Sequence, residues 1–140
     1  MLGAGGAGRA VAYALSGLGV STIHWLNRTV PRAREAASAL ALSCEVRCHP
    51  LDADSFRGLA PDLGLVVDAT AGPALEVVES LDIEALPREA AWVDLNYWRR
   101  PCPMVERMRS SGRVAQEGDR MLHHQADLAF AQFRRALVSR

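Results

Sequence analysis

The chain begins with MLGAGGAGRA at residues 1–10, and the glycine spacing in this stretch decides how the fold is interpreted. Gly3, Gly5 and Gly8 form the pattern Gly-x-Gly-x-x-Gly, which is typical of a dinucleotide-binding turn between a buried strand and a helix. The first glycine permits the tight turn, the second lets a pyrophosphate approach the backbone, and the third lets the helix pack closely. Together with Gly6 and Ala7, these residues are our candidates for a phosphate-binding turn.

A turn without a ligand could use the same glycines, so the surrounding sequence has to separate the two interpretations. Segment 9–18 is rich in Ala and Leu and predicts a helix that follows at once and stops at Gly19. Segment 21–27 is rich in β-branched and aromatic residues and predicts a strand that ends roughly 20 residues after the turn, as the dinucleotide pattern requires. Both features favour a bound dinucleotide.

The rest of the chain continues the alternation of strands and helices. Strands are predicted at 44–50, 63–70, 90–97 and 112–116, and helices at 29–42, 103–110 and 119–138, with Thr29 as a helix cap. Segment 52–62 predicts a short helix and a loop, and segment 74–90 a loop with a weak helical pattern. This order predicts an α/β fold of the Rossmann type, a doubly wound parallel sheet with helices on both faces. Only Met1 and Leu2 precede the glycine turn, so we expect the first strand to be largely missing.

Composition excludes several other classes of protein. The 140 residues suit one domain, and 49% hydrophobic and 23% charged residues are ordinary for a globular chain. Sixteen basic residues balance sixteen acidic ones, which argues against a nucleic-acid or membrane surface as a partner. No membrane span or signal peptide is apparent, and three cysteines do not make a disulfide framework, so we expect a cytoplasmic protein.

The end of the predicted strand at 21–27 indicates which dinucleotide binds. A site selective for NAD often places an acidic residue there, whereas this chain has the neutral Asn27 followed by Arg28 and Arg32. One arginine–phosphate contact contributes roughly 1–4 kcal/mol, and about 1.4 kcal/mol is a tenfold change in affinity. We therefore predict NADP, with the arginines on its 2′-phosphate. Solvated charges are the alternative, although cations at a helix start oppose the helix dipole.

Several motifs, in order, resemble the C-terminal NADP-binding domain of shikimate dehydrogenases. These are GAGGAGRA at 3–10, NRTVPRA at 27–33, VVDATAGP at 66–73, WVDLNYWRRPCPMV at 92–105 and EGDRMLHHQADLAF at 117–130. The second motif matches the family's N-R-T-x-x-R-A pattern fully. The resemblance covers nearly the whole chain and implies that residues 1–140 are the NADP-binding half of an enzyme that interconverts 3-dehydroshikimate and shikimate in aromatic amino acid biosynthesis.

The resemblance also implies roles for individual residues. Around the adenosine 2′-phosphate it places Asn27, Arg28, Thr29 and Arg32. Along the cofactor it places Thr70, with Met121 near the nicotinamide, and it implies that Tyr97 and Gln125 contact the shikimate-type substrate. Asp68, Ala71 and Arg120 depart from the family's Asn, Ser and Gly, which leaves open the placement of the nicotinamide and the choice among shikimate, quinate and related hydroxy acids.

The family's catalytic Lys and Asp belong to an N-terminal substrate domain. All sixteen basic residues of this chain are Arg, so we assign no catalytic residue here and expect that domain to be absent. Hydride transfer to a keto group needs a proton donor, so the chain alone should be inactive toward shikimate. Two alternatives remain: a stand-alone NADP-binding module without catalysis, and the cofactor domain of an enzyme like glutamyl-tRNA reductase.

Other conspicuous residues receive a structural interpretation. We expect His123 and His124 to be ordinary helix residues. A strand would separate Cys44 and Cys48 by about 13 Å, too far to share a metal, so no metal site is predicted. We expect the remaining notable side chains to fill the core (Trp25, Trp92), face a cleft (Trp98), cap backbone amides (Asp68, Asp94) or lie in a solvated loop (Arg99, Arg100).

Overall fold

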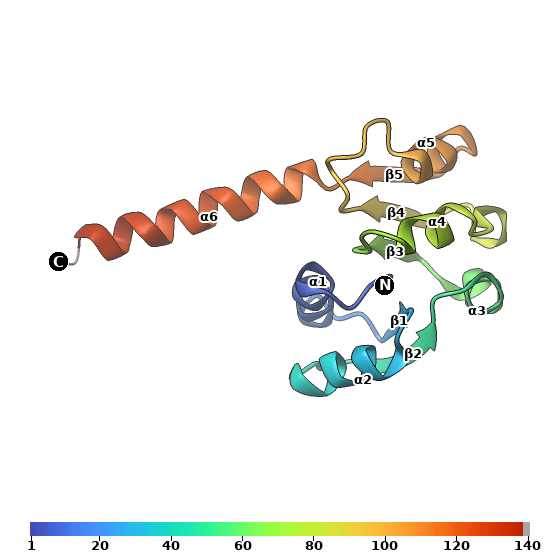
Figure 1. The fold of residues 1–140 in the computed structure, drawn as a ribbon, viewed down its shortest axis with the longest axis horizontal. Coiled ribbons are helices and arrows are strands. Elements are labelled where there is room, and N and C mark those ends of the chain that lie inside the picture. The colour runs from blue at the N-terminus through green and yellow to red at the C-terminus, as the bar shows by residue number, and fades with distance from the viewer. Residues whose placement is uncertain (139–140) are drawn as a thin grey trace.

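The computed structural model describes residues 1–138, and it shows one parallel sheet with helices on both faces (Figure 1). Its strands are β1 (Thr22–Asn27), β2 (Glu45–Pro50), β3 (Leu65–Asp68), β4 (Ala91–Asp94) and β5 (Val114–Glu117). Its α-helices are α1 (Gly6–Gly17), α2 (Val30–Ala39), α3 (Ala53–Leu59), α4 (Ala74–Glu79), α5 (Pro103–Ser110) and α6 (Asp119–Val138). Short 3₁₀ helices lie at Ala60–Asp62 and Ile83–Ala85.

The two ends of the sheet are joined through the second residue of the chain. β1 pairs with β2, and β3, β4 and β5 pair in that order, all in parallel. Leu2 forms parallel bridges to Leu26 of β1 and to Asp68 of β3, so it occupies the central position of the sheet. The spatial order β2–β1–Leu2–β3–β4–β5 is that of a doubly wound fold. The predicted fold class is confirmed, and in this structure the first strand consists of one bridged residue.

Each face of the sheet carries its own hydrophobic core. One core joins Trp25 of β1 and Val67 of β3 to Ala12 of α1 and Ala33 of α2. The other joins Leu2, Trp92 of β4 and side chains of α3, α4 and α5, namely Phe56, Val78, Met104, Val105 and Met108. Alternate residues of a strand point to opposite faces, which explains why the continuous apolar runs of β1 and β3 contribute to both cores.

Most predicted elements have the predicted type, with bounds shifted by a few residues. α5 coincides with the predicted helix at 103–110, and Gly19 has the left-handed φ of +84° predicted for the end of α1. α1 begins at Gly6, so the glycine turn itself supplies the first helical turn. The prediction of a Thr29 cap is wrong: Thr29 precedes α2, but its side chain makes no capping hydrogen bond. Its carbonyl instead accepts one from Asn27.

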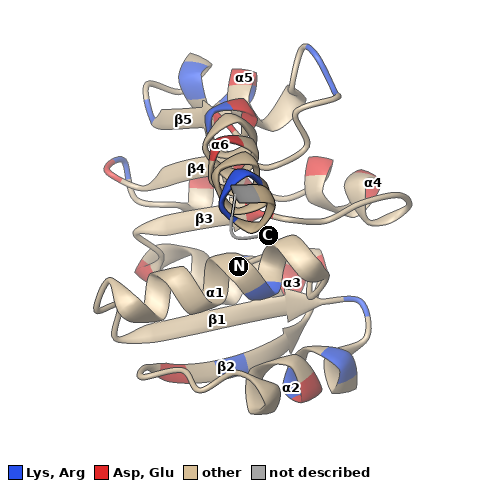
Figure 2. Ribbon diagram, turned by 90° about the vertical axis from the view of Figure 1, so that its left-hand side faces the viewer, with Lys and Arg blue, Asp and Glu red and all other residues tan. Residues whose placement is uncertain are grey.

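α6 extends away from the rest of the molecule (Figure 1), and its distal apolar side chains Leu128, Phe130, Phe133 and Leu137 are at least 67% exposed. None of the described helices is long and apolar enough to span a membrane. Figure 2 shows basic and acidic positions scattered over the helices and loops at both ends of the sheet, as the balanced composition predicts.

Candidate functional site

The glycine turn is held close against the sheet. Gly3 has φ +88°, and a Cβ at this position would lie 2.7 Å from the carbonyl oxygen of Ala69. The indole Nε1 of the fully buried Trp25 donates a hydrogen bond to the Gly3 carbonyl oxygen at 2.8 Å. Gly8 is equally constrained, because its Cβ would overlap the same carbonyl of Gly3. The first and third glycines therefore serve the tight turn and the close packing predicted for them.

The middle of the turn is open. Gly5 and Gly6 are exposed, and a Cβ at either position would meet no heavy atom within 4 Å. Gly5 precedes α1 without a capping side chain, and the first turn of the helix contains no acidic residue. The free N–H groups of such a helix start carry a partial positive charge and favour an anion.

The end of β1 is tied to this turn by one side chain. The Asn27 Oδ1 accepts a hydrogen bond from the Ala4 amide at 3.1 Å, while its Nδ2 donates to the Thr29 carbonyl at 2.9 Å. Arg28 and Arg32 follow at the start of α2, and both are exposed. Neither guanidinium forms a hydrogen bond or an ion pair with another residue within 1–138. Two uncompensated cations thus stand beside the glycine turn.

A cavity of about 330 Å³ opens beside the turn at the carboxyl edge of the sheet. It brings together seven residues predicted from the sequence: Gly5, Gly6, Ala7, Thr70, Tyr97, Met121 and Gln125. Trp98, the predicted cleft aromatic, also lines it. The residues that sequence reasoning missed are Ala69, Ala71, Leu95, Asn96, Gly118 and Leu122. Their common signal is that each lies within three residues of the end of a strand or of the start of α6, where ligands bind in such folds.

The other predicted residues lie outside this cavity. Gly3 and Gly8 are buried in the turn, and Asn27, Arg28, Thr29 and Arg32 lie along the end of β1 and the start of α2. His123 and His124 are exposed on α6 and do not line the cavity. Among the described residues, no group of three or more His, Cys, Asp or Glu side chains could hold a metal ion.

A buried polar network joins the ends of β3 and β4 beneath the cavity. Asp68 Oδ1 accepts hydrogen bonds from the Thr70 amide at 2.8 Å and hydroxyl at 2.6 Å, and Asp94 Oδ1 accepts from the Asn96 amide at 2.8 Å. The Asn96 Nδ2 donates to Asp94 Oδ1 at 2.9 Å and to Asp68 Oδ2 at 3.4 Å. The two carboxylates cap backbone amides, as predicted, and position Thr70 and Asn96.

Burial controls the ionisation of this network. It raises the pKa of Asp68 to about 6, with the charge of Asp94 adding to the rise and the Thr70 hydrogen bonds opposing it. The Cys102 thiol donates to Asp94 Oδ2 at 2.9 Å, and burial together with this hydrogen bond raises its pKa to about 12. Cys102 is therefore a protonated structural donor rather than a reactive thiolate.

The arginines of the 97–102 loop are paired within the protein. Arg99 forms an ion pair with Glu79, and Arg100 forms ion pairs with Glu117 and Asp119, both at 3.2 Å. Their charges are therefore compensated, in contrast to those of Arg28 and Arg32. Acidic side chains of the chain itself therefore hold both guanidinium groups of this loop.

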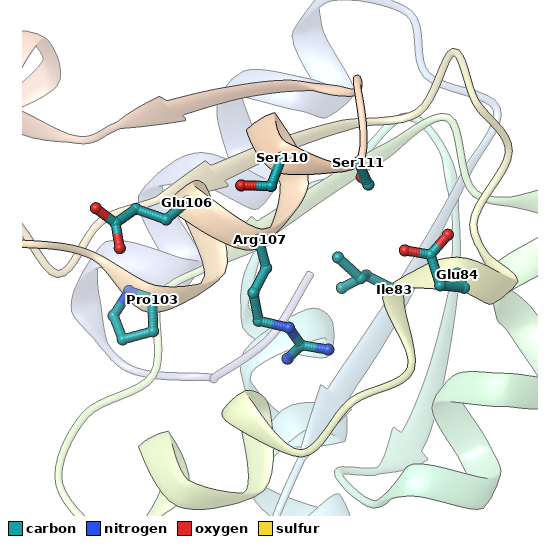
Figure 3. A pocket seen from close by; sticks show the side chains of 7 residues that line it. All are labelled: Ile83, Glu84, Pro103, Glu106, Arg107, Ser110 and Ser111. Atoms are coloured by element: carbon teal, nitrogen blue, oxygen red, sulfur yellow. The ribbon is translucent and has the colours of Figure 1, made fainter.

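A second hollow, of about 580 Å³, lies between α5 and the 3₁₀ helix Ile83–Ala85 and shares no lining residue with the first (Figure 3). Figure 3 shows Arg107 extending from α5 toward the segment that contains Ile83. Its guanidinium donates to the carbonyl oxygens of Glu79 at 2.6 Å and Leu81 at 3.1 Å. Arg107 therefore fastens α5 to the end of α4.

Comparison with known proteins finds the chain similar to shikimate dehydrogenases over most of its length. No family model matches the chain. Curated relatives include shikimate dehydrogenases (NADP(+)) from Nitrobacter winogradskyi, 37% identical over 132 residues, and from Rhizobium rhizogenes, 35% identical over 131 residues. Each alignment covers 93% of this chain, which spans about half the length of the relatives, 46% and 44% respectively.

Solved structures give the same result. Shikimate 5-dehydrogenase from Thermus thermophilus, in complex with NADP(H) and shikimate, is 36% identical with a TM-score of 0.66, over 92% of this chain and 46% of that one. Quinate dehydrogenase from Corynebacterium glutamicum, in complex with NAD, is 28% identical with a TM-score of 0.70, over 89% of this chain and 45% of that one.

Proposed function

We propose that this chain, which is related to shikimate dehydrogenases over more than nine-tenths of its length, supplies the NADP-binding part of such an oxidoreductase. The observation that carries the proposal is one juxtaposition. An open glycine turn at an uncapped helix start lies beside two arginines that no described residue neutralises. The turn suits a pyrophosphate and the arginines suit a further phosphate, so the ligand that fits both is a dinucleotide with an additional phosphate.

The pyrophosphate would lie over Gly5, Gly6 and Ala7. These residues are exposed, and the absence of side-chain atoms at both glycines lets the ligand approach the backbone. The N–H groups of the first turn of α1 would donate to the phosphate oxygens, and the helix dipole would add to the attraction. Gly3 and Gly8 would hold the shape of the turn without touching the ligand.

The 2′-phosphate would be bound by Arg28 and Arg32, with Asn27 and Thr29 beside them. Arginine suits this role because its planar guanidinium donates two parallel hydrogen bonds to a phosphate. Asn27 would have a second function, since its hydrogen bond to Ala4 fixes the distance between the two phosphate sites.

The cofactor would continue along Thr70 into the 330 Å³ cavity, with its nicotinamide near Met121. When bound, NADPH supplies the hydride for reduction of a keto group. Tyr97 and Gln125 line the same cavity and would contact a shikimate-type hydroxy acid from the cofactor side. The Asp68–Asn96–Asp94 network would hold the Thr70 and Asn96 walls in place.

The proton donor for the reaction would come from outside this chain. Of the described residues that line the cavity, Tyr97 alone has a titratable side chain, and the sequence contains no Lys. We therefore propose that residues 1–140 act with an N-terminal substrate domain that carries the catalytic pair, in reduction of 3-dehydroshikimate to shikimate. The three free cysteines favour a reducing compartment, and we place the protein in the cytoplasm.

Trp98 provides a direct test. It is 59% exposed and lines the cavity, whereas Trp25 and Trp92 are fully buried. Titration of the 140-residue chain with NADP should give a saturable change in tryptophan fluorescence that Trp98→Phe abolishes. Gly6→Ala should leave the fluorescence of the free chain unchanged and prevent saturation. An identical NADP titration in Gly6→Ala would contradict binding at the glycine turn.

A further inference from the structure

Two carboxylates lie buried side by side at the carboxyl edge of the sheet, behind the wall of the 330 Å³ cavity. Asp68 ends β3 and is 1% exposed, and Asp94 ends β4 and is 5% exposed. They are partners in the parallel register of the two strands, and the Asn96 side chain donates a hydrogen bond to both. Neither carboxylate lines the cavity, but their hydrogen-bond partners Thr70 and Asn96 do.

The hydrogen bonds around the pair favour its charged form. Asp68 accepts from the Thr70 amide and hydroxyl and from the Asn96 side chain. Asp94 accepts from the amide and the side chain of Asn96 and from the Cys102 thiol. Hydrogen-bond donors stabilise a carboxylate relative to its protonated form. Burial raises the pKa of Asp68 to about 6, so at pH 8 its carboxyl is still ionised.

Among the described residues around the pair, no free cation cancels these charges. Arg99 lines the same small hollow as Asp68 and Asp94, but it forms an ion pair with Glu79, which also lines the hollow. The Met1 amine acts on Asp68 as well, but burial lowers its pKa to about 5, so it is neutral at pH 8. The hollow, of about 10 Å³, has room for no more than about one water, so solvent screens the pair weakly.

The two forms of the proposed cofactor differ in charge at the end that the cavity would hold. The nicotinamide ring is positively charged in NADP⁺ and neutral in NADPH, whereas the phosphates are the same in both. A protein tunes such a cofactor by the charges that it places near the reactive ring. Buried negative charges behind the cavity wall therefore attract the oxidised ring and act little on the reduced one.

We infer that Asp68 and Asp94 determine the preference of this site for the oxidised nicotinamide over the reduced one. They act through the cavity wall, so they set specificity without being catalytic residues. Tighter binding of the oxidised form makes the loss of a hydride from bound NADPH more favourable, so the pair favours reduction of the keto group. The inference rests on the proposed function, because it requires the nicotinamide in this cavity.

The experiment is calorimetric titration of the 140-residue chain with NADP⁺ and with NADPH at pH 8. Asp68→Asn removes one charge and keeps an oxygen that can accept from Thr70. It should weaken binding of NADP⁺ roughly tenfold and leave the affinity for NADPH unchanged. Asp94→Asn should have the same effect. Equal losses for both forms would indicate a structural role only, and unchanged affinities would indicate no role; either result overturns the inference.

Two further variants separate charge from packing. Thr70→Val removes the hydroxyl that bonds to Asp68 without changing a charge, so it should weaken both forms alike and keep the ratio of their dissociation constants. Asp62→Asn, at an exposed position on the 3₁₀ helix Ala60–Asp62, should change neither affinity. A ratio that changes as much in Thr70→Val as in Asp68→Asn would overturn the inference, because the ratio would then report packing.

The same titrations distinguish this inference from the proposed function. If the parent chain binds neither NADP⁺ nor NADPH, the proposed function is wrong and the inference is overturned with it. If the parent binds both forms and the ratio of their dissociation constants is the same in Asp68→Asn and Asp94→Asn, the inference alone is overturned.

Discussion

The Asn27 side-chain oxygen accepts a hydrogen bond from the backbone amide of Ala4, with 3.1 Å between the two atoms. This bond joins the end of β1 to the glycine turn across 23 residues of sequence. It places the part of the chain that would hold a 2′-phosphate in fixed relation to the part that would hold the pyrophosphate.

Two substitutions of Asn27 distinguish the role of its hydrogen bonds from the effect of a negative charge beside the 2′-phosphate. Asn27→Ala loses the hydrogen bonds to Ala4 and Thr29. Each has a net value of about 0.5–1.5 kcal/mol, and the loss of the bond to Ala4 should weaken NADP and NAD alike by roughly two- to tenfold. Asn27→Asp keeps an acceptor for Ala4 but adds a negative charge, and should weaken NADP much more than NAD. Calorimetric titration of both dinucleotides checks this. Equal losses for NADP and NAD in Asn27→Asp would contradict a nearby 2′-phosphate.

The arginines at the start of α2 should act on the 2′-phosphate alone. Arg28→Ala and Arg32→Ala should each reduce NADP affinity by roughly tenfold, corresponding to about 1.4 kcal/mol for an exposed charged contact, and leave NAD affinity unchanged. Arg34→Ala, exposed on the same helix, is the matched control and should have no effect. The loss should shrink at high salt, where exposed charges are screened. NADP binding that is insensitive to both substitutions would refute the clamp.

Substitution of the turn glycines should affect either the stability of the fold or the affinity for NADP, depending on the position. Gly8→Ala should lower the free energy of unfolding by on the order of 2 kcal/mol, because its Cβ overlaps the Gly3 carbonyl. Gly6→Ala should preserve stability, because its Cβ meets no atom, and should lose NADP affinity. Thermal denaturation and titration of each variant provide the comparison. A folded, normally stable Gly8→Ala chain would show that the close approach of Gly8 to the Gly3 carbonyl is not required.

Asp68 should make the free energy of unfolding of the chain depend on pH. Its pKa is raised to about 6 in the folded chain from the ordinary 3.8, so the folded state binds more protons between these values. Its contribution to stability is therefore greatest below pH 4 and is lost as the pH rises through 6. Since one pKa unit corresponds to about 1.4 kcal/mol, Asp68→Asn should gain up to about 3 kcal/mol relative to the parent across that range.

Denaturant unfolding at pH 4.5 and 7.5 measures this difference. Asp127→Asn, at an exposed position on α6, is the control and should follow the parent curve. If the Asp68→Asn and parent curves run parallel over the whole range, the raised pKa is wrong.

The chain by itself should bind NADP without oxidising shikimate. Hydride transfer requires a positioned proton acceptor, and Tyr97 alone offers a titratable side chain within the described part of the cavity. An NADPH absorbance assay with saturating shikimate and NADP should therefore match the blank. Measurable turnover by the 140-residue chain would show that the catalytic pair is not needed from another domain.

The parts of this site that depend on local sequence could be predicted. The glycine spacing, the apolar runs of β1 and β3 and the arginines after Asn27 each lie within one short segment, and their positions in the fold follow from strand–helix alternation. The expectation that little of the first strand precedes the glycine turn required the same rule, and in the structure only Leu2 forms bridges there, to Leu26 and Asp68.

Contacts between distant segments were harder to predict. Asn96 reaches Asp68 across 28 residues, and this link depends on the adjacency of β3 and β4, which periodicity does not specify. The prediction that Thr29 caps α2 was wrong for a related reason, because the capping rule considers only Thr29 and the helix that follows it. Here Asn27, held by its bond to Ala4, donates to the Thr29 carbonyl, while the Thr29 side chain stays exposed.

The central claim is that the glycine turn and the two arginines form one site for NADP. Its most direct test is calorimetric titration of the 140-residue chain with NADP and with NAD at the same pH and ionic strength. We predict that NADP binds at least tenfold more tightly, and that the Arg28→Ala, Arg32→Ala double variant binds the two equally. Equal affinities in the parent chain, or no binding of either dinucleotide, would contradict the claim.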